Sequence, residues 1–176
     1  MDSYLRSLEI EIHVEAAAEF SIPRIAQLTQ RTNQFNLTTR RYSEADIKAL
    51  AEDDASEVFC VSVRDKFGDY GIVGVAIIRY RDGEGEFDTF LLSCRVIGRG
   101  IEDAFLTRAS EHARHRCDRL VGRYVPTRKN GQVADFYPKR GFTVVSESAD
   151  EAVFQLGKDD ALPPISDALK SVQFTA

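Results

Sequence analysis

The sequence predicts an α+β fold in which helices flank a mixed, mostly antiparallel and twisted sheet. Short segments that alternate apolar and polar residues recur along the chain and are separated by turn residues. Two helical patterns lie between the first of these segments and the central ones. In the second half, an apolar strand runs through a glycine-containing loop into a helix and then into another strand. This crossover predicts one parallel strand pair in the sheet.

Composition indicates a single globular domain. The chain has 176 residues and a net charge of −5, so it does not resemble a nucleic-acid or membrane-surface binder. None of the apolar runs reaches the roughly 18 residues of a membrane span, and the start lacks a signal-peptide pattern. Cys60, Cys94 and Cys117 show no paired spacing, which favours reduced thiols and a cytoplasmic location. We therefore expect neither a membrane nor a nucleic-acid partner.

The first half predicts two helices and four strands. Residues 8–14 alternate as an edge strand does, and 21–33 form a helix with Ser21 as its N-cap and Pro23 in its first turn. A polar segment follows at 30–42, and Ser43 with Asp46 then resembles a capping box that opens a second helix. Residues 57–65 and 72–80 predict a hairpin, and residues 86–94 predict the next strand.

The second half begins with a helix at 101–116, where Ile101, Ala104 and Phe105 recur at helical spacing. A strand at 120–126, a short helix at 130–139 and a hairpin of 142–146 with 151–156 complete the predicted domain, residues 1–157. Residues 158–176 predict a C-terminal tail, in which 165–172 can add an amphipathic turn or two.

The most informative motif is the loop that joins the strand at 86–94 to the helix at 101–116. Glycines at 98 and 100 allow the backbone to approach an anion, and the helix N-terminus directs free N–H groups at it. The alternative is that the glycines only permit a tight turn. The predicted anion-binding residues are Arg95, Val96, Ile97, Gly98, Arg99 and Gly100.

Two motifs resemble the GNAT acyltransferase superfamily. They are Arg95-x-x-Gly98-x-Gly100 before a helix, and Asn130-x-x-x-Ala134-x-Phe-Tyr137-x-x-x-Gly141-Phe142. This resemblance covers residues 8–156 and implies a GNAT-like fold whose loop at 95–100 holds the pyrophosphate of coenzyme A. It also implies that Tyr137 protonates a departing thiolate.

A narrower match resembles the C-terminal GNAT-like half of FkbH-like proteins. Its segments are Asn33-Gln-Phe-Asn-Leu-Thr-Thr-Arg40, Leu92-Ser-Cys-Arg-Val-x-Gly-Arg99 and Tyr124-x-Pro-Thr-x-x-Asn130. That family implies transfer of an acyl group, such as a glyceryl group, to or from the phosphopantetheine thiol of an acyl carrier protein. It also implies a HAD-type partner domain, fused N-terminally or supplied separately, because the Asp-x-Asp signature of that domain is absent here.

Cys94 has two interpretations. Nearby positive charge and helix-terminal amides favour the thiolate form of a cysteine, which can carry an acyl group as a thioester. Alternatively, Cys94 is a small residue that closes the strand.

Tyr137 and Asn130 also have two interpretations. Tyr137 is either a proton donor or a packing aromatic, and Asn130 is either a hydrogen-bond partner of the pantetheine arm or of the active-site loop, or a helix N-cap.

The polar segment lies between the two predicted helices, where the resemblance places the acyl substrate. Its amides and hydroxyls suit a hydroxylated acyl chain, although such groups also stabilise irregular loops. The predicted substrate-binding residues are Asn33, Gln34, Asn36, Thr38 and Thr39.

The predicted function is acyl transfer to or from a phosphopantetheine thiol, on a carrier protein or on coenzyme A, with a small-molecule acyl donor. A coenzyme A-dependent N-acetyltransferase and a non-catalytic carrier-docking module remain as alternatives. No metal is expected, since His112 and His115 lack completing ligands in sequence.

Overall fold

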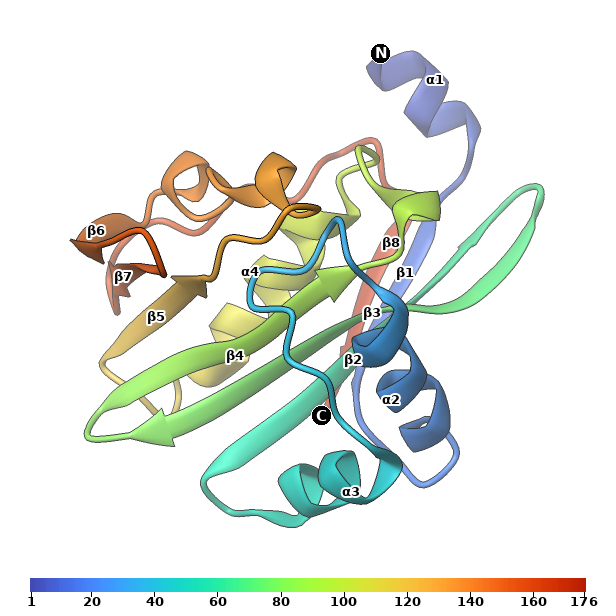
Figure 1. Cartoon of the computed structure of the whole chain (residues 1–176). Coiled ribbons are helices and arrows are strands. Elements are labelled where there is room, and N and C mark those ends of the chain that lie inside the picture. The colour runs from blue at the N-terminus through green and yellow to red at the C-terminus, as the bar shows by residue number, and fades with distance from the viewer.

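A computed structural model describes all residues 1–176. One eight-stranded sheet has the order β6-β7-β5-β4-β3-β2-β1-β8. All neighbouring strands are antiparallel except the pairs β4–β5 and β1–β8 (Figure 1). The helices are α1 (Asp2–Ser7), α2 (Ile22–Arg31), α3 (Glu44–Glu52) and α4 (Ile101–Ala113). The strands are β1 (Glu11–Ala16), β2 (Ser56–Asp65), β3 (Gly68–Arg81), β4 (Glu84–Leu92), β5 (Arg119–Tyr124), β6 (Thr143–Glu147), β7 (Ala152–Gly157) and β8 (Ser171–Thr175).

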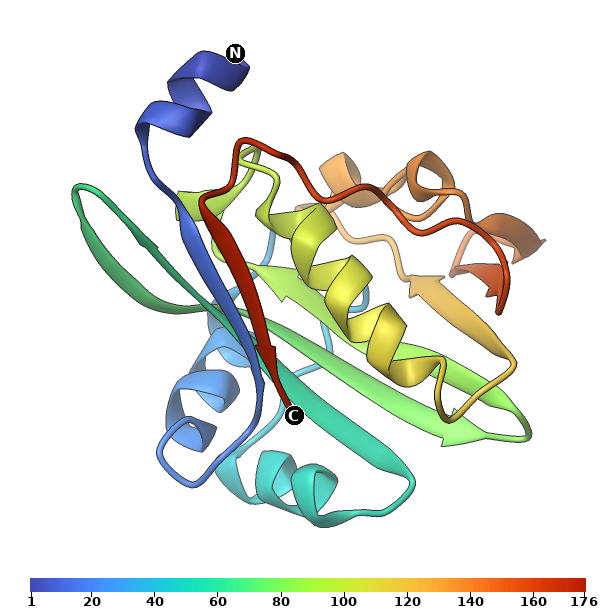
Figure 2. The ribbon, with the colours of Figure 1, turned by 180° about the vertical axis from the view of Figure 1, so that it is seen from behind.

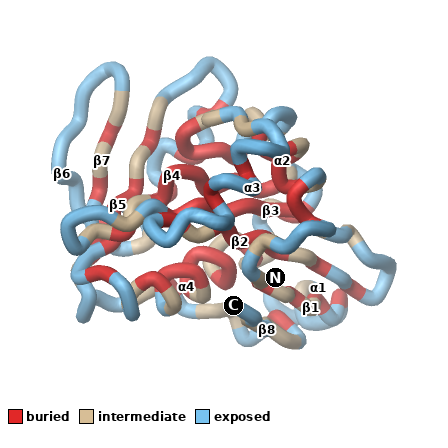
Figure 3. Tube along the Cα trace, turned by 90° about the horizontal axis from the view of Figure 1, so that it is seen from below, coloured by how far each residue is buried: buried red, intermediate tan, exposed pale blue.

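Helices cover both faces of the sheet, as predicted. Helix α4 lies on one face, and α2 and α3 lie on the other (Figures 1 and 2). The α4 face buries the larger apolar cluster, which includes Phe90 and Phe105. The α2–α3 face buries a smaller one built around Ile25 and Ile47. Viewed along the sheet, the buried stretches run through the central strands, whereas β6 is exposed along its whole length (Figure 3).

The predicted helix caps have different outcomes. Ser43 and Asp46 form the capping box: the Ser43 Oγ accepts from the Asp46 N–H at 3.1 Å, and the Asp46 carboxylate accepts from the Ser43 N–H at 2.9 Å. Ser21 precedes α2 but its side chain caps no N–H of that helix, because its Oγ accepts from Ala18 instead. Sequence spacing alone does not distinguish these two uses of a serine.

Three further elements differ from the prediction, and the first is α1 (Asp2–Ser7), where no helix is expected. The short helix expected at 130–139 is a pair of 3-10 turns, Gly131–Val133 and Pro138–Arg140, because Pro138 supplies no N–H for a continuous helix. The expected tail contains β8, which pairs in parallel with β1. Phe174 of β8 packs on Phe59 with ring centroids 5.7 Å apart, so the last strand belongs to the sheet.

The strands β4 and β5 diverge, and this divergence positions the site. Their pairing covers only residues 84–87 with 119–122, so β4 continues to Leu92 without β5 beside it. Helix α4 begins just beyond the free end of β4. No helix of the chain is long and apolar enough to cross a membrane.

Candidate functional site

A cationic pocket lies where β4 ends. Its volume is about 690 Å³, and it is lined by α2, the segment after α2, the end of β4 and the loop after β5. No carboxylate lines it, and none of its four basic side chains forms an ion pair. The basic residues are Arg24, Arg31, Arg95 and Lys129. A pocket of this size and charge suits a small anionic ligand.

Arg24 shows how the pocket concentrates charge. Its Nε donates to the Ile72 carbonyl oxygen at 3.3 Å and its Nη1 to Gln27 Oε1 at 2.6 Å, so the guanidinium is fixed by neutral groups. Burial lowers the pKa of Arg24, and the charges of Arg95 and Arg31 lower it further. The cations therefore repel one another, and an anion bound among them would relieve that repulsion.

Cys94 is the exposed thiol of the chain and lies in this pocket. It lies two residues after the end of β4 and begins a three-residue 3-10 turn, Cys94–Val96. Cys60 and Cys117 are buried. Burial raises the pKa of Cys60 to about 12, and it also raises the pKa of Cys117. Cys94 is thus the cysteine that an external substrate can reach.

The loop before α4 has the geometry of an anion site. Gly98 and Gly100 have φ values of +80° and +82°, which side-chain-bearing residues rarely adopt. The N–H groups of Ile97, Arg99, Gly100 and Ile101 donate no hydrogen bond within the protein. The Glu102 carboxylate lies against the N–H of Gly98, and its Oε2 is buried without a partner. An acidic side chain of the protein itself therefore lies beside the donors of this loop.

The two arginines of the loop lie in different places. Arg95 lines the cationic pocket, as the prediction requires. Arg99 instead pairs with Asp65 at 3.4 Å, and its guanidinium lies over the Tyr70 ring at 5.7 Å. Arg99 thereby attaches the loop to the hairpin of β2 and β3. Among the other predicted anion-binding residues, Val96 is fully buried.

Only part of the predicted substrate-binding segment reaches the pocket. Asn33 and Gln34 line it, and Asn33 Oδ1 also accepts from Arg41 at 2.5 Å. Asn36 is buried, and its side chain bonds the backbone of Thr32 and Thr39. Thr38 is also buried. It donates to the Asp88 carbonyl oxygen at 2.8 Å, and the Thr39 Oγ1 is buried without a partner. The side chains of Asn36 and Thr38 thus hold the protein's own backbone, whereas the Thr39 hydroxyl bonds nothing.

Asn130 is fully buried and bonded to the chain itself. Its Nδ2 donates to the carbonyl oxygens of Asn36 and Val125, and its Oδ1 accepts from the Thr127 N–H and the Tyr124 hydroxyl. Its side chain makes no capping bond to the turn that follows. Asn130 occupies the N-cap position of the Gly131–Val133 turn, but its amide is turned back toward residues 124–127 and 36 and caps no N–H of that turn.

Tyr137 lies in an aromatic cluster away from the pocket lining. Its ring packs against Phe142 at 4.9 Å and so close to Gly122 that a Cβ there would approach it to 2.7 Å. The hydroxyl is buried without a partner, and burial raises the pKa of Tyr137 well above its ordinary value. A proton-donor role for Tyr137 requires its hydroxyl to become accessible, so this role stays a prediction.

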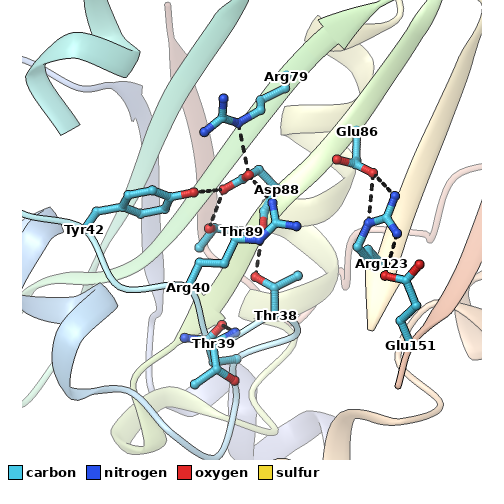
Figure 4. A network of polar contacts seen from close by, with 11 residues as sticks. Thr38, Thr39, Arg40, Tyr42, Arg79, Glu86, Asp88, Thr89, Arg123 and Glu151 are labelled. Carbon is cyan, nitrogen blue, oxygen red and sulfur yellow. Dashed lines mark hydrogen bonds and ion pairs between the residues drawn. The ribbon is translucent and has the colours of Figure 1, made fainter. Parts of the chain in front are cut away.

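A second polar cluster centres on Asp88 of β4, on the face that carries α2 and α3 (Figure 4). The Asp88 carboxylate is almost fully buried and accepts from Arg40, Arg79, Tyr42 and Thr89. Beside it, Glu86 accepts twice from Arg123, at 3.0 and 2.6 Å, and Arg123 also bonds Glu151. Asp88 and Glu86 are thus both held by arginines and are poorly placed to act as bases.

Sequence reasoning missed three of the pocket's four cations: Arg24, Arg31 and Lys129. Arg24 and Arg31 are seven residues apart, which places them on one face of α2 two turns apart, and that spacing is a usable signal. Lys129 carries no local signal, because the fold alone brings it to α2. No cluster of three or more histidine, cysteine or acidic side chains is placed to hold a metal ion.

Comparisons with known proteins show the fold. No protein-family model matches the chain, and no curated protein sequence matches it. Among solved structures, a GNAT-family acetyltransferase from Streptococcus pneumoniae matches with a TM-score of 0.61 and 16% identity, over 84% of this chain and 99% of that one.

Two further structures are similar to the same degree. A ribosomal-protein alanine N-acetyltransferase from Escherichia coli gives a TM-score of 0.63 at 14% identity, over 85% of this chain and 96% of that one. Spermidine N-acetyltransferase from Vibrio cholerae, solved in complex with CoA and spermine, gives a TM-score of 0.62 at 13% identity, over 84% of this chain and 96% of that one. The chain therefore has the GNAT acetyltransferase fold, which confirms the predicted fold class.

Proposed function

We propose that this protein transfers an acyl group to or from the thiol of a phosphopantetheine arm carried by an acyl carrier protein. One observation carries the proposal: the exposed Cys94 lies in a pocket with four unpaired cations and no carboxylate. The GNAT fold is consistent with acyl transfer. The FkbH-like segments at 33–40, 92–99 and 124–130 all contribute to the pocket or to its walls.

The pocket's cations fit the phosphate of such an arm. A phosphodiester bears one negative charge, and arginine forks bind phosphate oxygens through paired N–H donors. Arg24, Arg31, Arg95 and Lys129 would hold the phosphate, and the free amides of Ile97, Arg99, Gly100 and Ile101 would extend the positive surface. The arm supplies a thiol, or a thioester that carries the acyl group.

Cys94 would carry the acyl group between two thiols as a covalent thioester. Its thiol loses a proton to solvent, and the sulfur attacks the carbonyl carbon of the bound thioester, forming a new S–C bond. The original C–S bond breaks, and its electron pair leaves with the carrier thiolate, which takes up a proton. The reverse exchange, on a second thiol, releases the acyl group from Cys94. No net oxidation or reduction occurs.

The acyl chain would lie toward Asn33 and Gln34, whose side chains line the same pocket. Amide groups hydrogen-bond hydroxyls as both donors and acceptors, which suits a hydroxylated acyl group such as glyceryl. A HAD-type partner domain would act before or with this domain on a small-molecule acyl donor.

Coenzyme A-dependent N-acetyltransfer is the second candidate, favoured by the fold and by a fold neighbour solved with CoA. An amine acceptor must lose a proton, yet neither a carboxylate nor a histidine lines the pocket. The positive charge of the pocket also repels a protonated amine. The third candidate, a non-catalytic docking module, predicts that the pocket binds a carrier protein without covalent change.

Intact-mass spectrometry tests the proposal. The protein is incubated with acylated carrier protein, with and without the HAD-type domain, and digested to locate the adduct. We expect an acyl mass on Cys94 and none on Cys94→Ala, in which Cys60 and Cys117 remain as internal controls. Absence of any adduct or transferred acyl group with all partners present would refute the proposal, and acetylation of an amine from acetyl-CoA would support the second candidate.

A cation variant tests the phosphate site separately. We expect Arg24→Ala to weaken binding of 4′-phosphopantetheine by about ten- to hundredfold, the effect of a lost charge-assisted hydrogen bond. Arg128→Ala is the matched control, because Arg128 is an exposed cation next to Lys129 that does not line the pocket. Equal weakening by both variants would show only general charge attraction.

A further inference from the structure

Residues 35–38 occupy the gap that opens between β4 and β5. The Leu37 N–H donates to the Phe90 carbonyl oxygen at 3.2 Å, and the Leu92 N–H donates to the Phe35 carbonyl oxygen at 3.0 Å. On the other side, the Val125 N–H donates to the Leu37 carbonyl oxygen at 2.8 Å. This segment, which we call the gap segment, therefore bonds β4 along one edge and the end of β5 along the other.

The gap segment belongs to the core of the protein. All four of its side chains are buried. The Phe35 ring packs edge-on against Phe136, with centroids 5.4 Å apart, and lies 6.5 Å from Phe90. Because all of its side chains are buried, the gap segment is a fixed element of the sheet rather than a loop that lies over it.

Asn130 holds the gap segment to the β5 side. A primary amide offers two N–H donors and an oxygen with two lone pairs, and Asn130 uses all four within the protein. The bond from its Nδ2 to the Asn36 carbonyl oxygen, at 3.0 Å, joins residues 94 positions apart in the chain. No polar atom of Asn130 is left for a ligand.

Two backbone groups of β4 that face the gap are also hydrogen-bonded within the protein. The Phe90 carbonyl and the Leu92 N–H both bond the gap segment, so an extended ligand cannot pair with them while that segment stays in place. Phe35 and Leu92 are at the same time part of the pocket lining, next to Gln34 and Cys94. The gap segment thus forms a wall of the cationic pocket.

We propose that Asn130 is a positioning residue that locks the gap segment between β4 and β5, and that the phosphopantetheine arm reaches Cys94 along this wall rather than through the gap. The inference rests on the proposed function for the identity of the arm. It assigns recognition of the arm to pocket side chains, because the Phe90 carbonyl and the Leu92 N–H of the β4 edge already bond the gap segment.

Amide hydrogen exchange measured by NMR tests the route. The informative amides are Leu37, Leu92 and Val125, and the probe is 4′-phosphopantetheine, whose binding is followed by the signals of Cys94 and Arg95. We expect the three amides to exchange slowly and to stay equally slow when the probe saturates the pocket. Faster exchange at Leu37 and Leu92 on binding would mean that the arm displaces the gap segment, and the proposed route would be wrong.

Two variants test the lock. Asn130→Ala removes the bond to Asn36, and we expect exchange at Leu37 and Val125 to rise about ten- to hundredfold, as for a buried bond that is lost. Tyr124→Phe is the matched control, since it removes only the 3.3 Å bond to Asn130 Oδ1 and leaves the gap segment bonded. We expect the affinity for the probe to fall in Asn130→Ala and to stay unchanged in Tyr124→Phe. Equal effects of the two variants would show that Asn130 has only a general structural role.

The outcomes for the two proposals are separable. If the probe moves no signal of Cys94 or Arg95, the proposed function fails, while the exchange rates of Asn130→Ala still decide whether Asn130 locks the segment. If the probe binds and Leu37 loses protection, the proposed function stands and the inference about the route fails.

Discussion

At the N-terminus of α4, the carboxylate of Glu102 lies against the backbone N–H of Gly98. The sequence predicts that this N–H binds an external anion. Burial raises the pKa of Glu102 above its ordinary value near 4.5, and the N–H groups of Glu102 and Gly98 lower it by less. The folded state therefore holds this proton more tightly than the unfolded chain. The stability that the protonated Glu102 carboxyl contributes is present below about pH 4.5 and is lost as the pH rises through the raised pKa.

Glu102→Gln should remove this pH dependence. We expect the variant to gain thermal stability relative to the parent at pH 7 and to gain nothing at pH 4, as measured by melting curves. It should also bind inorganic phosphate about two- to fivefold more tightly, since one charge at a helix N-terminus contributes about 0.3–1 kcal/mol. Unchanged phosphate affinity would show that the loop amides take no part in binding.

Tyr137→Phe separates catalysis from packing. The Tyr137 hydroxyl is buried without a hydrogen-bond partner, so its removal should leave the free energy of unfolding unchanged or raise it by up to about 1–3 kcal/mol. Chemical denaturation measures this change. A fall of about a hundredfold or more in the acyl-transfer rate, with stability intact, would support the predicted proton-donor role.

At the scale of elements, the connection from β4 to α4 depends on two left-handed glycines. We expect Gly98→Ala to cost about 1–2 kcal/mol, because φ is +80° there although nothing lies within 4 Å of the added Cβ. Gly131→Ala is the control: that glycine also has open space, but its φ is not positive. It should be neutral or slightly stabilising. Equal losses from both, measured by denaturation, would contradict a conformational requirement at Gly98.

At the scale of the whole molecule, β8 joins the C-terminal end of the chain to the first strand. Phe174 packs on Phe59 and on His112 of α4, at 5.7 and 5.4 Å between centroids. We expect Phe174→Ala to lower the free energy of unfolding by about 1–2 kcal/mol, because full burial of such a side chain contributes about 1.5–3 kcal/mol and Phe174 is half-buried. Val144→Ser, on the exposed strand β6, should change it by less than about 0.5 kcal/mol. A Phe174 variant as stable as the parent would mean that β8 is dispensable.

The sequence by itself determined the elements whose signals are local. Residues only a few positions apart indicate three such features: the capping box of Ser43 and Asp46, the buried face of α2 and the glycine loop before α4. Backbone conformation and amphipathic spacing act over that range, so these features could be predicted. The crossover from β4 through α4 to β5 followed from the same local patterns.

Only the tertiary structure decided what the polar residues do. Asn36, Thr38 and Asn130 offer the same hydrogen-bonding groups whether they face a ligand or the backbone, and the divergence of β4 from β5 turned them inward. The same divergence, together with the packing of α2, brought Arg24, Arg31, Arg95 and Lys129 around Cys94 from three separate segments. Contacts between distant segments depend on the fold as a whole, so local patterns indicate at most the separate cations of α2 and of the loop before α4, and not the pocket that joins them.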